Sequence, residues 1–214
     1  MPSVDRGWNR PGRRTLFGIA AAGMAWAGQS RAQSPADAHK VIADLYAALQ
    51  TEMRSGLRFQ QRFDQLAPVI DRVFDLGTIL QVSVGLRWAS LDEAARRSLS
   101  AVFRTFTIAS YTANFDKDDG EKFDVLPQTR ASGADLVVES NLVPANGDPI
   151  RIDYVMRGGT AGWRIVDVLL NGSISRVAVQ RSDFRSLLAS GSPVPLIDSL
   201  KKKVVELSGG AMRP

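Results

Sequence analysis

The hydrophobic pattern of this chain changes its period twice, and this change constrains the fold strongly. Before about residue 115, apolar residues recur every three or four positions, which is typical of amphipathic helices. Between 121 and 170 they alternate with polar residues, as they do along strands with one buried face. Beyond residue 180 the helical spacing returns. A sheet placed between two groups of helices predicts an α+β fold.

Three helical patterns precede the predicted sheet. The first opens with Ser34-Pro35-Ala36-Asp37, a serine cap followed by a proline and an acid. The second contains Pro68, which predicts a kink or an end because proline cannot donate the helical hydrogen bond. The third covers roughly 91–115 and follows a capping box at residues 90–93. It carries two apolar stripes, so we expect it to be buried on more than one side.

Strand signals fill the middle of the chain. Asn146-Gly147 and Gly158-Gly159 are turn signals between alternating segments. We therefore predict an antiparallel meander of about four strands. The predicted strands are 121–130, 136–143, 150–157 and 163–170.

Helical spacing returns near residue 182. Ser182 is the expected cap of a helix that carries Phe184, and a break is expected at 191–195. A last amphipathic helix is expected over 197–207. Residues 209–214 are expected to be a flexible tail, so the folded part is predicted to be one domain over 33–208.

Residues 1–32 have the organisation of a secretory signal peptide. An arginine-rich start is followed by an apolar run over 16–27 and by the small-x-small site Ser30-Arg31-Ala32. The apolar run is shorter than the roughly 20 residues that span a bilayer, which favours cleavage over a membrane anchor. Arg13-Arg14 resembles a twin-arginine signal, so both Sec and Tat export stay open. We expect a cleaved signal and a periplasmic location in a Gram-negative cell.

The formal net charge of +5 is compatible with nucleic-acid binding, but its distribution is not. Five arginines and one aspartate lie within residues 1–32, so the rest of the chain is almost neutral. No nucleic-acid partner is therefore expected.

The protein is expected to be a monomer.

The sequence offers little for catalysis. It contains no cysteine and a single histidine, His39, which excludes thiol chemistry, a cysteine-ligated metal and a histidine-rich site. Phosphate-binding and nucleophile-elbow motifs are also absent. We predict no catalytic residue, metal or cofactor. Asp167 lies in a largely apolar strand, where it is either a general base or a structural hydrogen-bond acceptor. The structural role is favoured because no second acid or histidine lies near it in the sequence.

Residues 162–173, Gly-Trp-Arg-Ile-Val-Asp-Val-Leu-Leu-Asn-Gly-Ser, resemble the W-x-h-x-D-h-x-h-x-G segment of the MlaC family, also known as the toluene-tolerance auxiliary family. Further segments of the chain match the family pattern in the same order along the sequence. Two departures occur in them: Gly85 and Leu86 are inverted relative to the family, and Thr107 stands where the family often has leucine. Residues 172–175 and 181–184 look most like the hopanoid-associated HpnM branch. The agreeing pieces are 74–75, 85–88, 103–111, 150–154 and 180–184.

This resemblance implies an NTF2-like sheet wrapped by N- and C-terminal helices. It also implies a periplasmic carrier that moves a phospholipid, or a hopanoid-type lipid, between an inner-membrane ABC transport complex and an outer-membrane lipoprotein complex. The apolar patterns supply candidates for the lipid-binding wall, and Asp167 is assigned to structure. The wall candidates are Phe74, Leu80, Phe106, Tyr111, Ile152, Tyr154, Val166 and Val168.

Two other functions remain open at the level of sequence. One is an NTF2-like isomerase or dehydratase that acts on a lipid and uses Asp167 as its base. The other is a non-catalytic adaptor whose core is filled and has no cavity.

Overall fold

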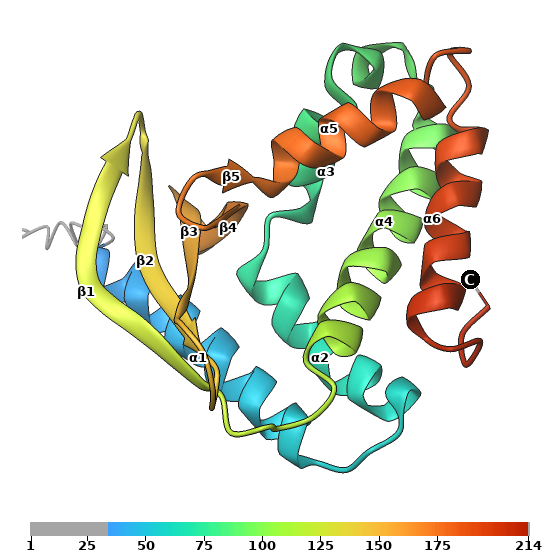
Figure 1. The fold of residues 1–214 in the computed structure, drawn as a ribbon. Helices are drawn as coiled ribbons and strands as arrows, with labels where there is room; N and C mark the ends of the chain where they lie inside the picture. Colours follow the sequence, from blue (N-terminus) through green and yellow to red (C-terminus); the bar gives the residue numbers. More distant parts are fainter. Residues whose placement is uncertain (1–33, 214) are drawn as a thin grey trace, which may run out of the picture. The chain divides into compact units, whose positions relative to one another are not determined.

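The computed structural model describes residues 34–213. The expected signal peptide at 1–32 lies outside the described residues. The order of elements is helices, sheet, helices, which confirms the predicted α+β class (Figure 1). Within residues 34–213, no helix combines the length and the apolar character needed to cross a membrane. The elements are α1 (Pro35–Arg54), α2 (Phe59–Val73), α3 (Leu76–Val84), the 3-10 helix η1 (Gly85–Ser90), α4 (Glu93–Asn114), β1 (Lys122–Ser132), β2 (Asp135–Val143), β3 (Ile150–Gly159), β4 (Gly162–Leu170), β5 (Ile174–Ser175), α5 (Arg176–Leu187) and α6 (Val194–Leu207).

The sheet is an antiparallel meander. Its five strands lie in the order β1-β2-β3-β4-β5, so neighbours in sequence are neighbours in space. The four predicted strands correspond to β1, β2, β3 and β4, and β5 adds a short fifth strand. The strand that the sequence did not reveal, β5, has two residues, which is too short for an alternating pattern.

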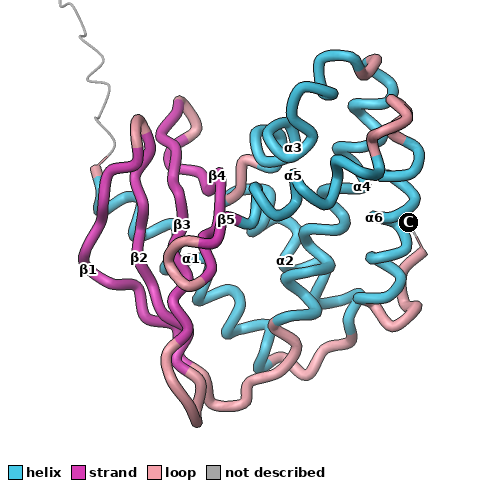
Figure 2. The backbone as a smooth tube through the Cα atoms, turned by 45° about the horizontal axis from the view of Figure 1, so that its top comes forward, coloured by secondary structure: helices cyan, strands magenta, loops and turns pink. Residues whose placement is uncertain are grey.

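The helices lie on one side of the sheet (Figure 2). We call the face toward them the inner face; it carries Val138, Ile152, Tyr154 and Met156, all buried. Helix α1 packs on this face, where the ring of Tyr46 stacks on Phe123 with 4.4 Å between ring centroids. Behind them, α4 packs against α6 and α3 packs against α5. The core therefore lies between the sheet and two further layers of helix.

Three helix boundaries differ from the sequence expectation. Helix α2 continues through Pro68 to Val73, because Ile70 and Val73 are buried beyond the proline and their packing outweighs one missing hydrogen bond. Helix α4 begins after Asp92, whose carboxylate accepts the Ala95 N–H at 2.7 Å. Helix α5 begins at Arg176, and Ser182, the expected cap, lies inside it. The actual cap is Ser175, which accepts the Ala178 N–H at 2.9 Å.

The segment after α6 folds back on the helix. The Gly210 N–H donates to the Val205 carbonyl at 2.8 Å and the Gly209 N–H to Glu206 at 3.1 Å, a Schellman motif in which Gly209 takes a φ of 58°. The Met212 N–H then donates to Ser208 Oγ at 3.1 Å. Residues 209–212 thus have hydrogen bonds that the sequence did not predict, and the flexibility of the tail stays a prediction.

Candidate functional site

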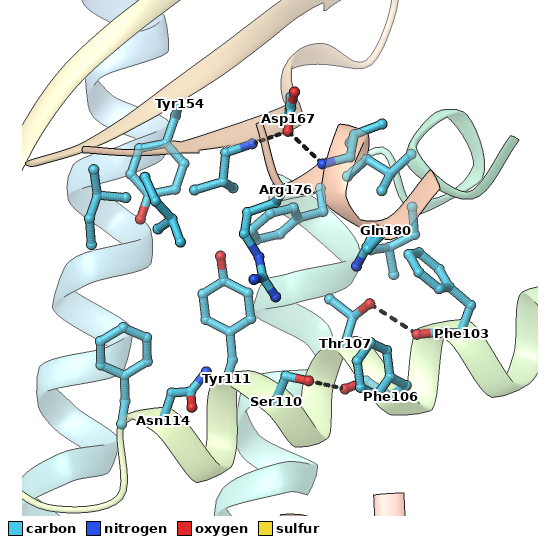
Figure 3. Close-up of a pocket in the computed structure, with 18 residues that line it drawn as sticks. Phe103, Phe106, Thr107, Ser110, Tyr111, Asn114, Tyr154, Asp167, Arg176 and Gln180 are labelled. Atoms are coloured by element: carbon cyan, nitrogen blue, oxygen red, sulfur yellow. Dashed lines mark hydrogen bonds between the residues drawn. The ribbon is translucent and has the colours of Figure 1, made fainter. Parts of the chain in front are cut away.

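A pocket of about 270 Å³ lies between the inner face of the sheet and helices α3, α4 and α5. In Figure 3, side chains from β3 and β4 face those of α4 across this space, with α5 at its edge. Most of the lining is apolar or aromatic. The lining residues are Phe74, Leu76, Ile79, Phe103, Phe106, Thr107, Ser110, Tyr111, Asn114, Phe115, Ile152, Tyr154, Asp167, Val168, Leu170, Arg176, Val177 and Gln180.

The link between α2 and α3 places Phe74 in the pocket wall. Phe74 forms a parallel bridge with Ile165 of β4, and the next N–H, from Asp75, donates to the Ile165 carbonyl at 2.9 Å. The Asp75 carboxylate then caps α3 by accepting the Thr78 N–H at 2.9 Å. The helical layer is therefore joined to the sheet at this corner, which holds the Phe74 ring 5.3 Å from that of Tyr111.

One face of α4 supplies the opposite wall. Phe103, Thr107, Ser110 and Asn114 follow one another at helical spacing, and Phe106 and Tyr111 flank them. The hydroxyls of Thr107 and Ser110 donate to carbonyls one turn earlier, at 2.9 and 2.7 Å, as Figure 3 shows. Because the Thr107 and Ser110 hydroxyls each have a partner in their own helix, an apolar ligand can contact them without leaving these two donors unsatisfied.

The tyrosines around the pocket are neutral at physiological pH. Burial raises the pKa of Tyr111 and that of Tyr154, and it also raises the pKa of Tyr46 behind the pocket. The Tyr46 hydroxyl lies 2.6 Å from Ser140 Oγ, which in turn donates to the Ile152 carbonyl. The wall formed by β3 is thus tied to α1 by a buried polar link that carries no charge.

Asp167 lies at the edge of the pocket with its carboxylate occupied by three donors. One oxygen accepts the N–H of Val168 at 2.7 Å and that of Val177 at 3.1 Å, and the other accepts the Ser175 hydroxyl at 2.5 Å. Figure 3 draws the two bonds that Asp167 accepts from backbone N–H groups. The contacts join the end of β4 to the start of α5.

The mouth of the pocket is polar. Of the lining residues, only Asn114 on α4 and Arg176 on α5 are exposed, and the others are buried or half-buried. Figure 3 shows the Arg176 guanidinium pointing from α5 toward the hydroxyl of Tyr111. The pocket therefore has an apolar interior and an opening flanked by an amide and a guanidinium.

The structure brings six of the eight predicted wall residues to this pocket and places two elsewhere. Leu80 is fully buried in the core, and α3 presents Leu76 and Ile79 to the pocket in its place. Val166 is an extra residue in β4, because Val155 pairs with Asp167 while Met156 pairs with Ile165. This bulge breaks the alternation from which Val166 and Val168 had been assigned to the same face. The six that line the pocket are Phe74, Phe106, Tyr111, Ile152, Tyr154 and Val168.

Several lining residues were missed because they are polar or lie outside apolar stripes. Thr107, Ser110 and Asn114 could have been found by continuing the helical spacing from Phe103. No periodic signal placed Arg176 or Gln180 in the pocket, since the helix was expected to begin only at the Ser182 cap.

The described residues offer no metal centre, since no three of their His, Asp and Glu side chains are grouped for coordination. A second cavity of about 250 Å³ shares Phe74 and Leu76 with the pocket. There the Arg104 guanidinium donates to both oxygens of Asp71, at 2.7 and 2.6 Å. The other two charged residues of its lining also have hydrogen-bond partners, since Asp75 accepts from Thr78 and Arg164 donates to the Asp71 carbonyl.

Comparison with known proteins matches the chain to a sequence family and to solved structures. A sequence-family model, described as MlaC protein, matches residues 39–202. The solved structure of the phospholipid-binding protein from Ralstonia solanacearum, in complex with a phospholipid, matches with a TM-score of 0.69 and 20% sequence identity. That match covers 83% of this chain and 99% of the other, and at this identity it shows a shared fold. Among curated proteins, none matches the chain.

Proposed function

Because the chain belongs to the MlaC family, we propose that it is a periplasmic lipid carrier and that the lipid tails occupy the pocket between α3, α4, α5 and the sheet. The composition of the pocket is the observation that supports this function most directly. Its interior is mostly aromatic and aliphatic, the Thr107 and Ser110 hydroxyls are satisfied within α4, and its two exposed residues, Asn114 and Arg176, are polar. Tails inside and a headgroup at the opening suit an amphipathic ligand.

The ligand is a phospholipid or a hopanoid-type lipid, and the carrier moves it between an inner-membrane ABC transport complex and an outer-membrane lipoprotein complex. The solved relative in fold holds a phospholipid, and the resemblance of 172–175 and 181–184 to the HpnM branch supports the hopanoid alternative. Export by a cleaved signal over residues 1–32 is part of the same proposal.

The energetics of transfer suit a shuttle. Burial of each CH₂ group from water contributes about 0.8 kcal/mol, but a lipid leaves a bilayer that is as apolar as the pocket. The net exchange is therefore close to balance, and loading or unloading can follow from contact with a partner complex. At about 270 Å³ the cavity is near the lower limit of roughly 300 Å³ for ligand pockets, so we expect the aromatic walls to move apart when the tails enter.

A binding role accounts better for Asp167 than an enzymatic one. A general base needs a free lone pair directed at the substrate, whereas this carboxylate already accepts three hydrogen bonds. No histidine and no second carboxylate of the described residues lines the pocket beside it. We therefore assign Asp167 the structural task of joining β4 to α5. An Asp167→Asn protein that loses lipid turnover but keeps its lipid content and stability would reverse this assignment.

The test is native mass spectrometry of the protein purified from a Gram-negative host, with lipid extraction of the same sample. We expect an adduct of one lipid per chain. Ser110→Trp places an indole inside the pocket and should remove the adduct. Ser98→Trp, an exposed position on the same helix and outside the pocket, should retain it. A wild-type protein that binds neither phospholipid nor added hopanoid would overturn the carrier function.

A further inference from the structure

The described lining of the pocket contains one cationic side chain, which has no hydrogen-bond or ion-pair partner within residues 34–213. Among the described lining residues, Arg176 is the only arginine, lysine or histidine. No hydrogen bond or ion pair joins its guanidinium to another group within residues 34–213. Arg104 and Arg157, in contrast, each meet a carboxylate, at 2.6 and 2.7 Å. A guanidinium has five donors in a planar fork, so Arg176 offers all of them to a ligand.

Arg176 is also in the position where a ligand's polar end must lie. It and Asn114 are the two exposed residues of the lining, and they come from α5 and α4 on either side of the mouth. A lipid with its tails among Phe103, Phe106 and Ile152 would leave its headgroup between them. Both side chains donate hydrogen bonds, and the forked guanidinium matches two oxygens of a phosphate.

The one carboxylate near the mouth does not compete for this role. Asp167 keeps its three donors from Val168, Ser175 and Val177, and it makes no ion pair with Arg176. The tyrosines of the lining are neutral. An anionic oxygen entering the mouth therefore meets an unpaired positive charge, whereas a ligand cation would find no free carboxylate among the described lining residues.

We propose that Arg176, assisted by Asn114, binds the headgroup phosphodiester of the carried lipid and so selects phosphate-bearing lipids over uncharged lipids with the same apolar volume. This inference rests on the carrier function proposed above and deepens it, because it favours a glycerophospholipid over an uncharged polycyclic lipid. Soluble phosphate esters carry the same charged oxygens, so the test must distinguish a lipid headgroup from a soluble phosphate ester.

The experiment offers the delipidated protein an equimolar mixture of a phosphatidylglycerol and the diacylglycerol with identical acyl chains. The ratio of the two adducts is read by native mass spectrometry. We expect the wild type to favour phosphatidylglycerol by about tenfold, the range of one charge-assisted hydrogen-bonded contact at a partly exposed site. Arg176→Gln should bring the ratio close to one, and Arg176→Lys, which keeps the charge but not the fork, should give an intermediate ratio.

The matched control is Arg185→Gln, which removes the same charge from an exposed position of α5 outside the pocket and should leave the ratio unchanged. Glycerol 3-phosphate in excess should not displace the lipid. An unchanged ratio in Arg176→Gln, equal binding of both lipids by the wild type, or displacement by glycerol 3-phosphate would each overturn this inference and leave the carrier function standing. A wild type that binds neither lipid would overturn this inference, and it would overturn the carrier function as well if added hopanoid also failed to bind.

Discussion

The two faces of strand β3 show opposite chemistry across a single sheet. On the inner face, Ile152, Tyr154 and Met156 are buried against the helices, and the first two line the pocket. On the outer face, Arg151 and Asp153 point away from the helices, because side chains alternate along a strand. The ion pairs of β3 therefore lie on its outer face, away from the proposed ligand. Its inner face forms the pocket wall through apolar contacts, which a lipid can replace.

The outer face is organised around an ion cluster of Arg130, Glu139, Arg151 and Asp153. Arg151 donates to both oxygens of Asp153, at 3.0 and 3.1 Å, and lies 2.8 Å from Glu139. Arg130 approaches Asp153 at 3.5 Å and Glu139 at 3.7 Å. The side chain of Asp153 is 0% exposed, although both arginines remain more than 40% exposed. Each acid thus has two arginines, and the cluster joins β1, β2 and β3.

The turn after β4 completes this surface. Gly172 has a φ of 73°, and a Cβ at this position would lie 3.0 Å from Nε of Arg151. Its carbonyl also accepts a hydrogen bond from Arg130 at 3.3 Å. A side chain at residue 172 would therefore meet both backbone strain and the Arg151 guanidinium.

Removing the buried acid of the outer face should have the largest effect on stability. Asp153→Ala removes the buried one of the two carboxylates that Arg130 and Arg151 share, and we expect the free energy of unfolding to fall by about 2–3 kcal/mol. Urea denaturation measures this change. Asp44→Ala, which breaks an exposed pair with Lys40 on α1, should cost about 0.5 kcal/mol or less. If the folded Asp153→Ala protein also loses its lipid, the two faces are not independent.

Removing the hydrogen bond between Tyr46 and Ser140 on the inner face should have a smaller effect on stability. Tyr46→Phe removes the hydroxyl that meets Ser140, at a cost of about 1 kcal/mol, since Ser140 keeps the Ile152 carbonyl as its acceptor. Tyr111→Phe is the control, because the Tyr111 hydroxyl makes no hydrogen bond within residues 34–213 and its loss should leave stability almost unchanged. Urea midpoints compare the two variants. Equal costs would show that the Tyr46 link contributes nothing specific.

The smallest effect concerns Glu52, a buried acid that lacks the partners Asp153 has. Its side chain has an oxygen without a hydrogen-bond partner among the described residues, and burial raises its pKa, an effect that the charge of Arg62 partly opposes. The folded state therefore holds this proton more tightly than the unfolded state. The resulting stability is present below the unfolded pKa and is lost as the pH rises through the folded pKa.

Glu52→Gln removes this dependence, so the variant should gain stability relative to the wild type at pH 8 and gain none near pH 4. Urea titrations at the two pH values test this. Glu206→Gln on α6, where the glutamate is 61% exposed, should show no such difference. A gain that is the same at both pH values would mean that the effect is packing and not charge.

Sequence patterns accounted for the elements of this fold better than for its pocket. The change of period identified the helices and the meander, because hydrophobic spacing reports directly on which face of each element is buried. The segment 162–173 identified the family. On α4, the same spacing showed that two sides are buried, and Leu99, Val102 and Ile108 are indeed in the core. The same spacing continues from Phe103 to Ser110 and Asn114, but it could not show that this face lines a cavity.

By itself, then, the sequence determined the order of helices and strands, the near neutrality of the chain beyond residue 32, and the lack of thiol chemistry. Only the tertiary structure decided which apolar side chains surround a cavity. The bulge at Val166 shifted one strand residue away from the pocket, and the early start of α5 brought Arg176 to its mouth. The physical reason is that periodicity records burial along one element, whereas a cavity is a gap left among several elements whose relative positions depend on the packing of the whole core.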